Sequence, residues 1–235
     1  MSDGLTVITP TGGRTQAFSL CQKYVLGQDF DSYIQWIVVD DCIPETKTAA
    51  RTVLHPRAKW STGLNTQARN LLEAFPYIQC DKILIMEDDD WYSRSYISTM
   101  ARVLDDHLLA GCETTNYYHV PRHLYRINEH KNHSSLCSTG FHREMLPLLR
   151  HVCSESPFHS IDSRFWYRAL YQHRIQPGYL PRPMCCGMKG LPGRPGIGMG
   201  HRPENGNGWM EDNNLQILKS WVGDSWIDYK EFIDA

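Results

Sequence analysis

The stretch that most constrains the fold is an apolar run that stops abruptly at four acidic residues. Residues 82–86 read Lys-Ile-Leu-Ile-Met, and the acidic cluster Glu87, Asp88, Asp89 and Asp90 follows at once. A short apolar run with such an end is typical of a buried strand in a parallel sheet. Open α/β sheets bind ligands outside the carboxyl ends of their strands, so the acidic cluster is predicted to line a cleft.

Four adjacent carboxylates repel one another, and this repulsion raises the pKa of each unless a cation lies among them. A divalent metal ion is the simplest such cation, and carboxylate oxygens are ligands that Mg²⁺ and Mn²⁺ prefer. The acidic cluster therefore predicts a Mn²⁺ or Mg²⁺ site directly after the strand. The alternative interpretation is a solvated acidic turn.

Two further strands are predicted upstream, and each also ends in polar residues. Residues 5–9 precede a Pro-Thr-Gly-Gly turn, and residues 34–39 precede Asp40 and Asp41. Strands that alternate with helical stretches predict a parallel sheet of right-handed βαβ units, whose carboxyl ends lie at one edge. The three polar strand ends are therefore expected to share one cleft, although a turn or a helix N-cap is an alternative role for Asp40 and Asp41.

Length and composition predict a soluble protein of one α/β domain, or of one and a half. The chain has 235 residues, which suffice for a substantial core. No run approaches the roughly 18 to 20 apolar residues of a membrane span, and the first residues lack the features of a signal peptide. The eight cysteines show no CxxC spacing, which disfavours structural zinc and favours reduced thiols. A cytoplasmic protein with no membrane contact and no obligate protein partner is expected.

The small net charge of −2 hides a strong asymmetry along the chain. Residues 117–202 contain 12 Lys and Arg against 4 Asp and Glu, and 9 of the 11 histidines. Residues 1–116 and 203–235 each have a balance of −5, against +8 for the middle segment. The middle segment is therefore predicted to meet anionic groups.

Residues 181–209 form a separate compositional segment, with five prolines and eight glycines. This content predicts irregular structure, and a long loop in a compact chain is usually functional. Because the segment carries Lys189, Arg194, His201 and Arg202, it is predicted to fold over an anionic ligand as a flexible lid. The alternative is a surface linker.

Four motifs together resemble the family-2 type nucleotide-sugar glycosyltransferases of the GT-A fold. Residues 6–14 resemble the "VPTYNR" turn, residues 36–41 resemble "IVVDD", residues 63–70 resemble "G..ARN", and residues 86–96 resemble "LDADDWYHPEY". Their order and spacing agree over residues 5–97, and the rest of the chain matches only in outline. The resemblance implies a single Rossmann-like α/β domain, with a mostly parallel central sheet flanked by helices and a long Gly/Pro-rich loop near its C-terminus.

The resemblance also divides this domain into parts. Residues 1–116 would be the nucleotide-sugar-binding half and residues 117–180 the basic, acceptor-binding half. The lid loop would follow over residues 181–209, and residues 210–235 would form a helix and an acidic tail.

The resemblance implies roles at single positions. Asp89 would bind the metal, and Asp162 would be the catalytic base, with Glu155 as a second choice; a charge in the first turn of a helix is the alternative role of Asp162. The chemistry of the leaving group predicts His201 as a further metal ligand once the lid closes, and a solvated loop histidine is its alternative. The other residues would contact the nucleotide sugar. For the base and ribose they are Thr9, Pro10, Thr11, Arg14, Asp40, Asp41, Glu87 and Asp88, and for the diphosphate Arg69, Lys189, Arg194 and Arg202.

The predicted activity is metal-dependent, inverting transfer of a hexose or pentose from a nucleoside-diphosphate sugar, of the UDP type, to an acceptor hydroxyl. The basic middle segment favours an anionic acceptor, and a hydroxylated base in DNA is one hypothesis. A nucleotidyltransferase that acts on sugar phosphates is an alternative enzyme. A non-catalytic nucleic-acid-binding module is an alternative of another class.

Overall fold

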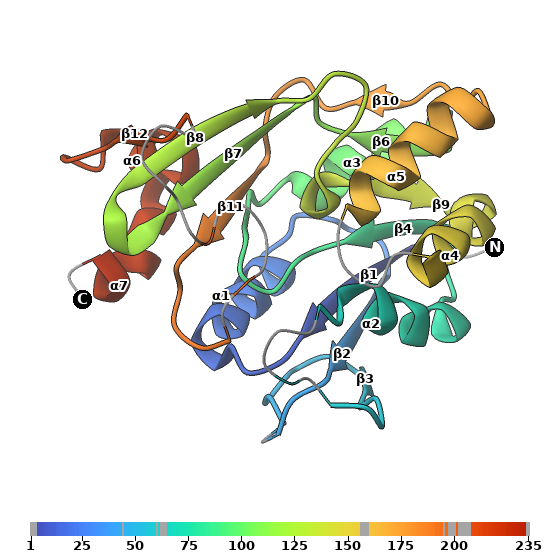
Figure 1. The fold of residues 1–235 in the computed structure, drawn as a ribbon, viewed down its shortest axis with the longest axis horizontal. Coiled ribbons are helices and arrows are strands. Elements are labelled where there is room, and N and C mark those ends of the chain that lie inside the picture. Colours follow the sequence, from blue (N-terminus) through green and yellow to red (C-terminus); the bar gives the residue numbers. More distant parts are fainter. Residues whose placement is uncertain are drawn as a thin grey trace.

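Three apolar runs of the sequence form the centre of a sheet in the computed structural model, which describes residues 4–43, 45–59, 61, 65–155, 160–194, 196, 201 and 208–233. β1 (Leu5–Thr11) pairs in parallel with β2 (Ile34–Asp40) on one side and with β4 (Lys82–Ile85) on the other (Figure 1). Their apolar side chains are buried in two clusters, one on each face of the sheet.

This first sheet has seven strands in the order β10-β6-β9-β4-β1-β2-β3. Its pairs are parallel except where β9 meets β4 and β6. The predicted α/β domain with a mostly parallel central sheet is therefore confirmed. The outer strands are β3 (Thr52–Leu54), β6 (Leu109–Gly111), β9 (Gly140–His142) and β10 (Gly178–Tyr179).

A second sheet of five strands, in the order β12-β8-β7-β11-β5, lies beside the end of β4. Its first connection to the central sheet is short, because β5 begins directly after the acidic cluster. β7 and β8 form an antiparallel hairpin, and β11 joins this hairpin to β5. The strands are β5 (Trp91–Tyr92), β7 (Thr114–His119), β8 (Leu124–Glu129), β11 (Cys185–Lys189) and β12 (Met210–Glu211).

Helices cover both faces of the first sheet, and two more pack on the second (Figure 1). Their apolar residues recur at helical spacing, as at Ile97, Met100 and Leu104 of α3, which are all fully buried. The helices are α1 (Thr15–Leu26), α2 (Gln67–Ala74), α3 (Tyr96–Asp106), α4 (Leu146–Glu155), α5 (Ile161–Tyr167), the π-helix Arg168–Gln172, α6 (Gln216–Val222) and α7 (Lys230–Ile233). Among the residues described, none of these helices has the length and apolar character of a membrane span.

The prediction of irregular structure over residues 181–209 is wrong at Cys185–Lys189. These residues form β11, and all five are buried. Prolines and glycines surround this short apolar run, but none of the prolines lies inside it, so the strand can pair on both edges. The segment predicted as a helix and an acidic tail, residues 210–235, begins with the short strand β12, and its first helix, α6, begins at Gln216.

Candidate active site

The acidic cluster forms the turn between β4 and β5, and it is largely buried. Asp88, Asp89 and Asp90 are 5%, 7% and 1% exposed. The cluster borders a cavity of about 640 Å³, which is large enough for a small organic ligand. The acidic wall of this cavity contains Pro10, Thr11, Arg14, Glu87, Asp88 and Asp89.

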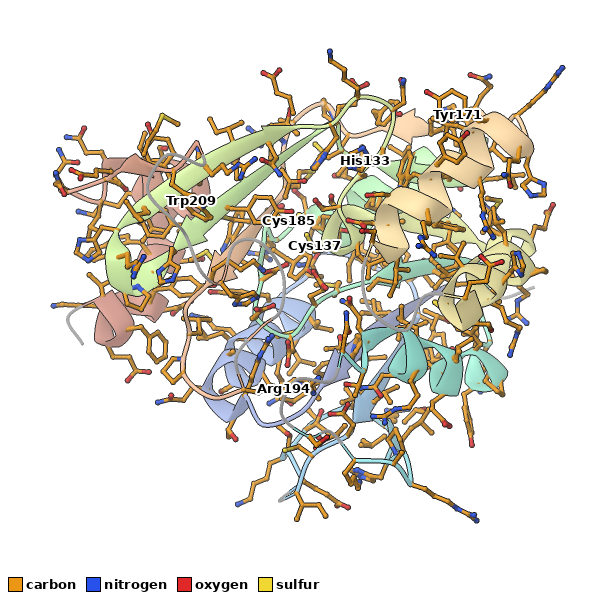
Figure 2. All side chains as sticks on the ribbon, in the orientation of Figure 1. His133, Cys137, Tyr171, Cys185, Arg194 and Trp209 are labelled. Carbon is orange, nitrogen blue, oxygen red and sulfur yellow. The ribbon has the colours of Figure 1, made fainter. Side chains whose placement is uncertain are left out.

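A second wall faces the acidic wall and comes from the middle of the chain. Its side chains project from the β7–β8 hairpin and from the loop that follows it. Figure 2 shows His133, Trp209 and Arg194, which all border the cavity, on three sides of the central part of the molecule. The hairpin wall contains Tyr117, Arg126, Asn128, His130, His133 and Ser135.

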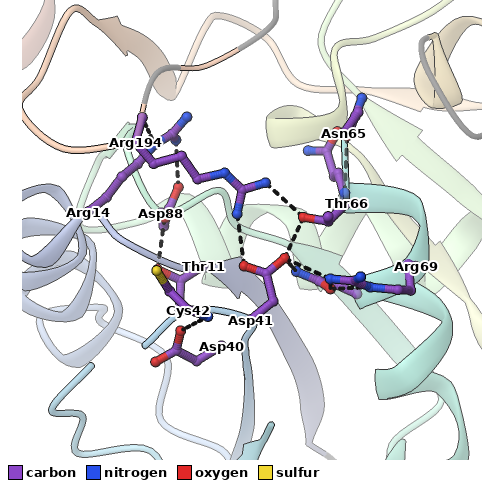
Figure 3. Close-up of polar contacts among 12 residues, drawn as sticks. Thr11, Arg14, Asp40, Asp41, Cys42, Asn65, Thr66, Arg69, Asp88 and Arg194 are labelled. Atoms are coloured by element: carbon purple, nitrogen blue, oxygen red, sulfur yellow. Dashed lines mark hydrogen bonds and ion pairs between the residues drawn. The ribbon is translucent and has the colours of Figure 1, made fainter. Parts of the chain in front are cut away.

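Arg14 binds two acids of the cluster at once. One guanidinium nitrogen lies 2.9 Å from Asp88 Oδ1 and 2.9 Å from Asp89 Oδ2. Thr11 Oγ1 donates to Asp88 Oδ2 at 2.8 Å, and Figure 3 shows Asp88 between Thr11 and Arg14. The turn that places Arg14 includes Gly13 at φ 71°, a backbone conformation that favours glycine. The strand end of β1 therefore contributes a cation as well as a turn.

Lys189 binds the acidic cluster from the opposite side. Its ammonium lies 2.9 Å from Asp90 Oδ1 and 3.7 Å from Asp89 Oδ2. Because Lys189 ends β11 and is only 7% exposed, it belongs to the sheet and not to a mobile lid. His201 lies nearby as well, with Nε2 3.6 Å from Asp89 Oδ2.

The four acids of the cluster differ in the direction in which their pKa values are shifted. Burial and the neighbouring Asp90 raise the pKa of Glu87 to about 8, and burial raises the pKa of Asp90 to about 6 even though Lys189 opposes the change. Burial also raises the pKa of Asp88. Burial alone would do the same to Asp89, but Lys189 and Arg14 hold its pKa well below the usual range. Asp89 is therefore the acid of this group that is most firmly ionised.

The residues of the cluster fit a divalent cation. Three carboxylates, those of Asp88, Asp89 and Asp90, meet two cations in the ion pairs, which leaves one more negative charge than positive ones. One buried oxygen, Asp90 Oδ2, has no hydrogen-bond partner among the described residues. The carboxylate of Asp89 is a ligand that both Mg²⁺ and Mn²⁺ accept, and the imidazole of His201 suits a transition metal such as Mn²⁺ better than Mg²⁺. Burial and Lys189 lower the pKa of His201 to about 3, which keeps the ring unprotonated.

A second network holds residues from three parts of the chain around Asp41 (Figure 3). Asp41 is fully buried and accepts hydrogen bonds from Thr66, from Arg69 at 3.0 Å, from Asn70 at 2.8 Å and from Arg194 at 2.8 Å. Its carboxylate is therefore occupied by protein groups. In this structure Asp41 organises the site, and its partners Thr66, Asn70 and Arg194 also border the cavity.

Some of the predicted nucleotide-binding residues do not reach the cavity wall. Thr9 is fully buried, and its hydroxyl accepts a hydrogen bond from Trp36 at 3.0 Å. Asp40 accepts hydrogen bonds from the backbone N–H groups of Cys42 and Thr46, so it stabilises a turn. Their side chains, with that of Arg69, lie behind the wall, whereas Pro10, Thr11, Arg14, Glu87, Asp88, Lys189 and Arg194 border the cavity.

Arg202 and the start of the predicted "G..ARN" motif at residues 63–64 lie outside the described residues. Asp162, the predicted base, does border the cavity, from the first turn of α5. The second choice, Glu155, instead binds Arg168 at 2.6 Å and His151 at 3.1 Å. Of the two carboxylates, the structure brings only Asp162 to the cavity wall.

The hairpin wall contains a hydrogen-bond network that was not predicted from the sequence. Ser135 Oγ lies 2.7 Å from the hydroxyl of Tyr117, 3.1 Å from His130 Nε2 and 3.1 Å from Thr115 Oγ1. Burial and His133 lower the pKa of His130 to about 4, so this ring is uncharged at neutral pH. Residues 115 and 117 on one strand, and 126 and 128 on the other, are each two positions apart, so all four lie on one face of the hairpin. This spacing was the signal in the sequence for the hairpin wall.

Comparisons with known proteins show a similarity of fold to solved structures. No family model matches the chain, and no curated protein matches its sequence. A crystal structure of S. aureus TarS residues 1–349 matches with a TM-score of 0.52 at 12% identity, over 78% of this chain and 60% of that one. TarS in complex with UDP-GlcNAc matches with a TM-score of 0.53 at 13% identity, over 78% and 58%.

The mannosyltransferase PcManGT from Pyrobaculum calidifontis, in complex with GDP-Man and Mn²⁺, matches with a TM-score of 0.54 at 14% identity, over 77% of this chain and 56% of that one. The chain thus spans about three fifths or less of these proteins. At such identities the likeness shows the fold alone. The chain therefore shares the fold of TarS and of this mannosyltransferase.

Proposed function

We propose that this chain is a metal-dependent glycosyltransferase of family-2 type, which moves a sugar from a nucleoside-diphosphate sugar to an acceptor hydroxyl. The observation that carries the proposal is the convergence of Asp89, Arg14, Lys189 and His201 on one cavity at the end of β4. Proteins of similar fold have been crystallised with UDP-GlcNAc or with GDP-Man and Mn²⁺. This supports the same class of donor, and a UDP-sugar is our first choice.

Asp89 and His201 would hold Mn²⁺ or Mg²⁺. Such an ion stabilises the negative charge that develops on the diphosphate as the glycosidic bond breaks. Arg14, Lys189 and Arg194 place further positive charge around the same cavity, where a buried setting strengthens its effect. The acidic wall would therefore bind the diphosphate and favour its departure.

The nucleoside would lie over the ends of β1 and β2. Pro10 and Thr11 border the cavity there, and Asp88 is fixed by Thr11 and Arg14 with its carboxylate beside that border. We assign the ribose to Asp88 or Glu87, because carboxylates accept hydrogen bonds from ribose hydroxyls.

The acceptor would enter along the hairpin wall. Inverting transfer needs a base that takes the proton of the acceptor hydroxyl, and we assign this role to Asp162. His130 is the second candidate, because its lowered pKa leaves the ring free to accept a proton. The charge of residues 117–202 favours an anionic acceptor, such as a hydroxylated base in DNA.

Two other functions make different demands on the chain. A nucleotidyltransferase would need a longer glycine-rich loop than the two glycines between β1 and α1. A non-catalytic nucleic-acid-binding module would leave the acidic cluster without a role, although this cluster is the most strongly organised part of the cavity.

The test is a panel of nucleotide sugars with Mn²⁺ or Mg²⁺, in which donor hydrolysis, thermal shift and the released nucleotide are measured. We expect a UDP-sugar to raise the melting temperature only with metal, and nucleoside diphosphate to be released. Release of pyrophosphate from a nucleoside triphosphate and a sugar phosphate would identify a nucleotidyltransferase instead. Chelation by EDTA should abolish both the shift and the hydrolysis.

A further inference from the structure

Two exposed tyrosines stand together outside the cavity, on the helix that carries Asp162. Tyr167 and Tyr171 are 58% and 57% exposed, and their ring centroids lie 5.1 Å apart. Single exposed aromatic residues are common, but two rings in contact form a continuous aromatic face that is exposed to solvent. No catalytic or donor-binding role described above uses this face.

The helix beneath the tyrosines is firmly anchored. Phe165, Trp166 and Ala169 point inward and are fully buried, so the outward rings stand on a rigid base. The helix changes from α to π geometry over Arg168–Gln172, which contains Tyr171. Short π segments are rare and are frequent at functional sites.

The aromatic face is linked to the cavity at two points. Asn132 Nδ2 donates to the hydroxyl of Tyr171 at 3.0 Å, and the next residue, His133, borders the cavity (Figure 2). At the other end of the helix, Asp162 and Ser163 also border the cavity. The helix that carries the tyrosines and the loop that binds Tyr171 therefore both reach the cavity that the acceptor is proposed to enter.

Cations accompany the two rings. Lys131 adjoins Asn132 in the chain, and Arg174 follows the π-helix. Both side chains are exposed, and neither is in an ion pair with any residue the structure describes. Aromatic rings beside cations are typical of sites for single-stranded nucleic acid, since bases stack on the rings and cations attract phosphates. A neutral sugar chain would stack on the rings without needing the cations.

We infer that Tyr167 and Tyr171 form a stacking platform for a single-stranded DNA acceptor, so that a base next to the stacked ones can reach the cavity. The inference rests on the proposed function, because the platform would serve to present DNA to the transferase. Binding of single-stranded DNA itself, however, needs neither donor nor metal. Its failure is therefore distinguishable from failure of the proposed transferase activity.

The test is the fluorescence anisotropy of a short labelled oligothymidylate with the full chain, at low and at high potassium chloride. The wild type should bind at low salt and weaken as salt rises, because phosphate contacts release counterions. Each of Tyr167→Ala and Tyr171→Ala should weaken binding about tenfold, while Tyr167→Phe, which keeps the ring, should bind like the wild type. Tyr77→Ala is the matched control, since Tyr77 is 51% exposed on the 3₁₀ helix Phe75–Tyr77.

Equal binding by the wild type and both alanine variants would overturn the platform, and so would an absence of binding at low salt. Competition by a neutral oligosaccharide would assign the rings to carbohydrate and overturn it as well. The metal-dependent thermal shift with a UDP-sugar, measured on the same variants, reports on the donor site. We expect this shift to be unchanged in all of them.

Discussion

The two walls of the cavity differ in how their charges are satisfied. On the acidic wall, Arg14 and Lys189 bind three of the four carboxylates of the acidic cluster from opposite sides. The hairpin wall is held instead by neutral groups, a phenol, a hydroxyl and an uncharged imidazole in one hydrogen-bond network. Arg126 borders this second wall without an ion pair to any described residue.

This difference indicates two kinds of binding. The acidic wall already holds its cations in place, so a charged ligand there meets groups that need little rearrangement. The hairpin wall has a cation whose counter-charge would come from the ligand. A fixed donor would suit the acidic wall, and a more variable acceptor would suit the hairpin wall. Three variants test how strictly donor binding and acceptor activation are divided between the two walls.

The largest effect is expected for Asp89→Ala on the acidic wall. Removal of the proposed metal ligand should lower transfer by at least about 1000-fold and abolish the metal-dependent thermal shift with UDP, because the leaving diphosphate loses its main stabilisation. Circular dichroism should show a folded chain. Asp31→Ala, at an exposed position, is the control. Retention of metal-dependent nucleotide binding would remove Asp89 from the site.

A smaller effect, on stability, is expected for Lys189→Met. This change leaves Asp90 buried without its cation, and loss of one partner of a buried ion pair costs about 3 kcal/mol. Chemical denaturation would measure the free energy of unfolding. Lys82→Met removes a surface pair with Asp105 and should cost about 0.5 kcal/mol or less. Similar losses in both variants would show that the acidic wall does not depend on internal cations.

The smallest of the three effects tests the hairpin side. Asp162→Asn should lower the turnover number about 100-fold with little change in donor KM, because it removes the proposed proton acceptor. His130→Gln keeps a polar side chain and should change turnover much less. The reverse result, a large loss in His130→Gln alone, would move the base from α5 to the hairpin wall.

The central strands and the acidic wall could be predicted because neighbouring residues carry the signal. An apolar run that ends in acids places the acids at a strand end, whatever the distant contacts are. Tertiary partners remained hidden, since nothing local says that Asp41 is enclosed by Thr66, Asn70 and Arg194. These contacts join residues up to 153 positions apart. The turn at Asp40 is a local contact, and the sequence offered it as an alternative.

The hairpin wall was harder to predict because its residues are spaced by two along separate strands. Tyr117 faces Arg126 across the hairpin, and the pair shares a wall with His130 from the following loop. β11 was missed because the surrounding prolines and glycines outweighed the short apolar run at residues 184–188, directly before Lys189. Composition averages over a long window of residues, whereas the formation of a central strand depends on its pairing with the strands at its two edges.

β11 has a mechanical consequence for the two substrates. One edge pairs with β7 of the hairpin, while the backbone N–H of Met188 and the ammonium of Lys189 both donate to Asp90. A strand bonded on both sides cannot shift alone, so a displacement of the hairpin is passed on to the carboxylates. Occupancy of one half of the cavity is thus expected to alter the affinity of the other, and the order in which the two reactants are added should affect the rate.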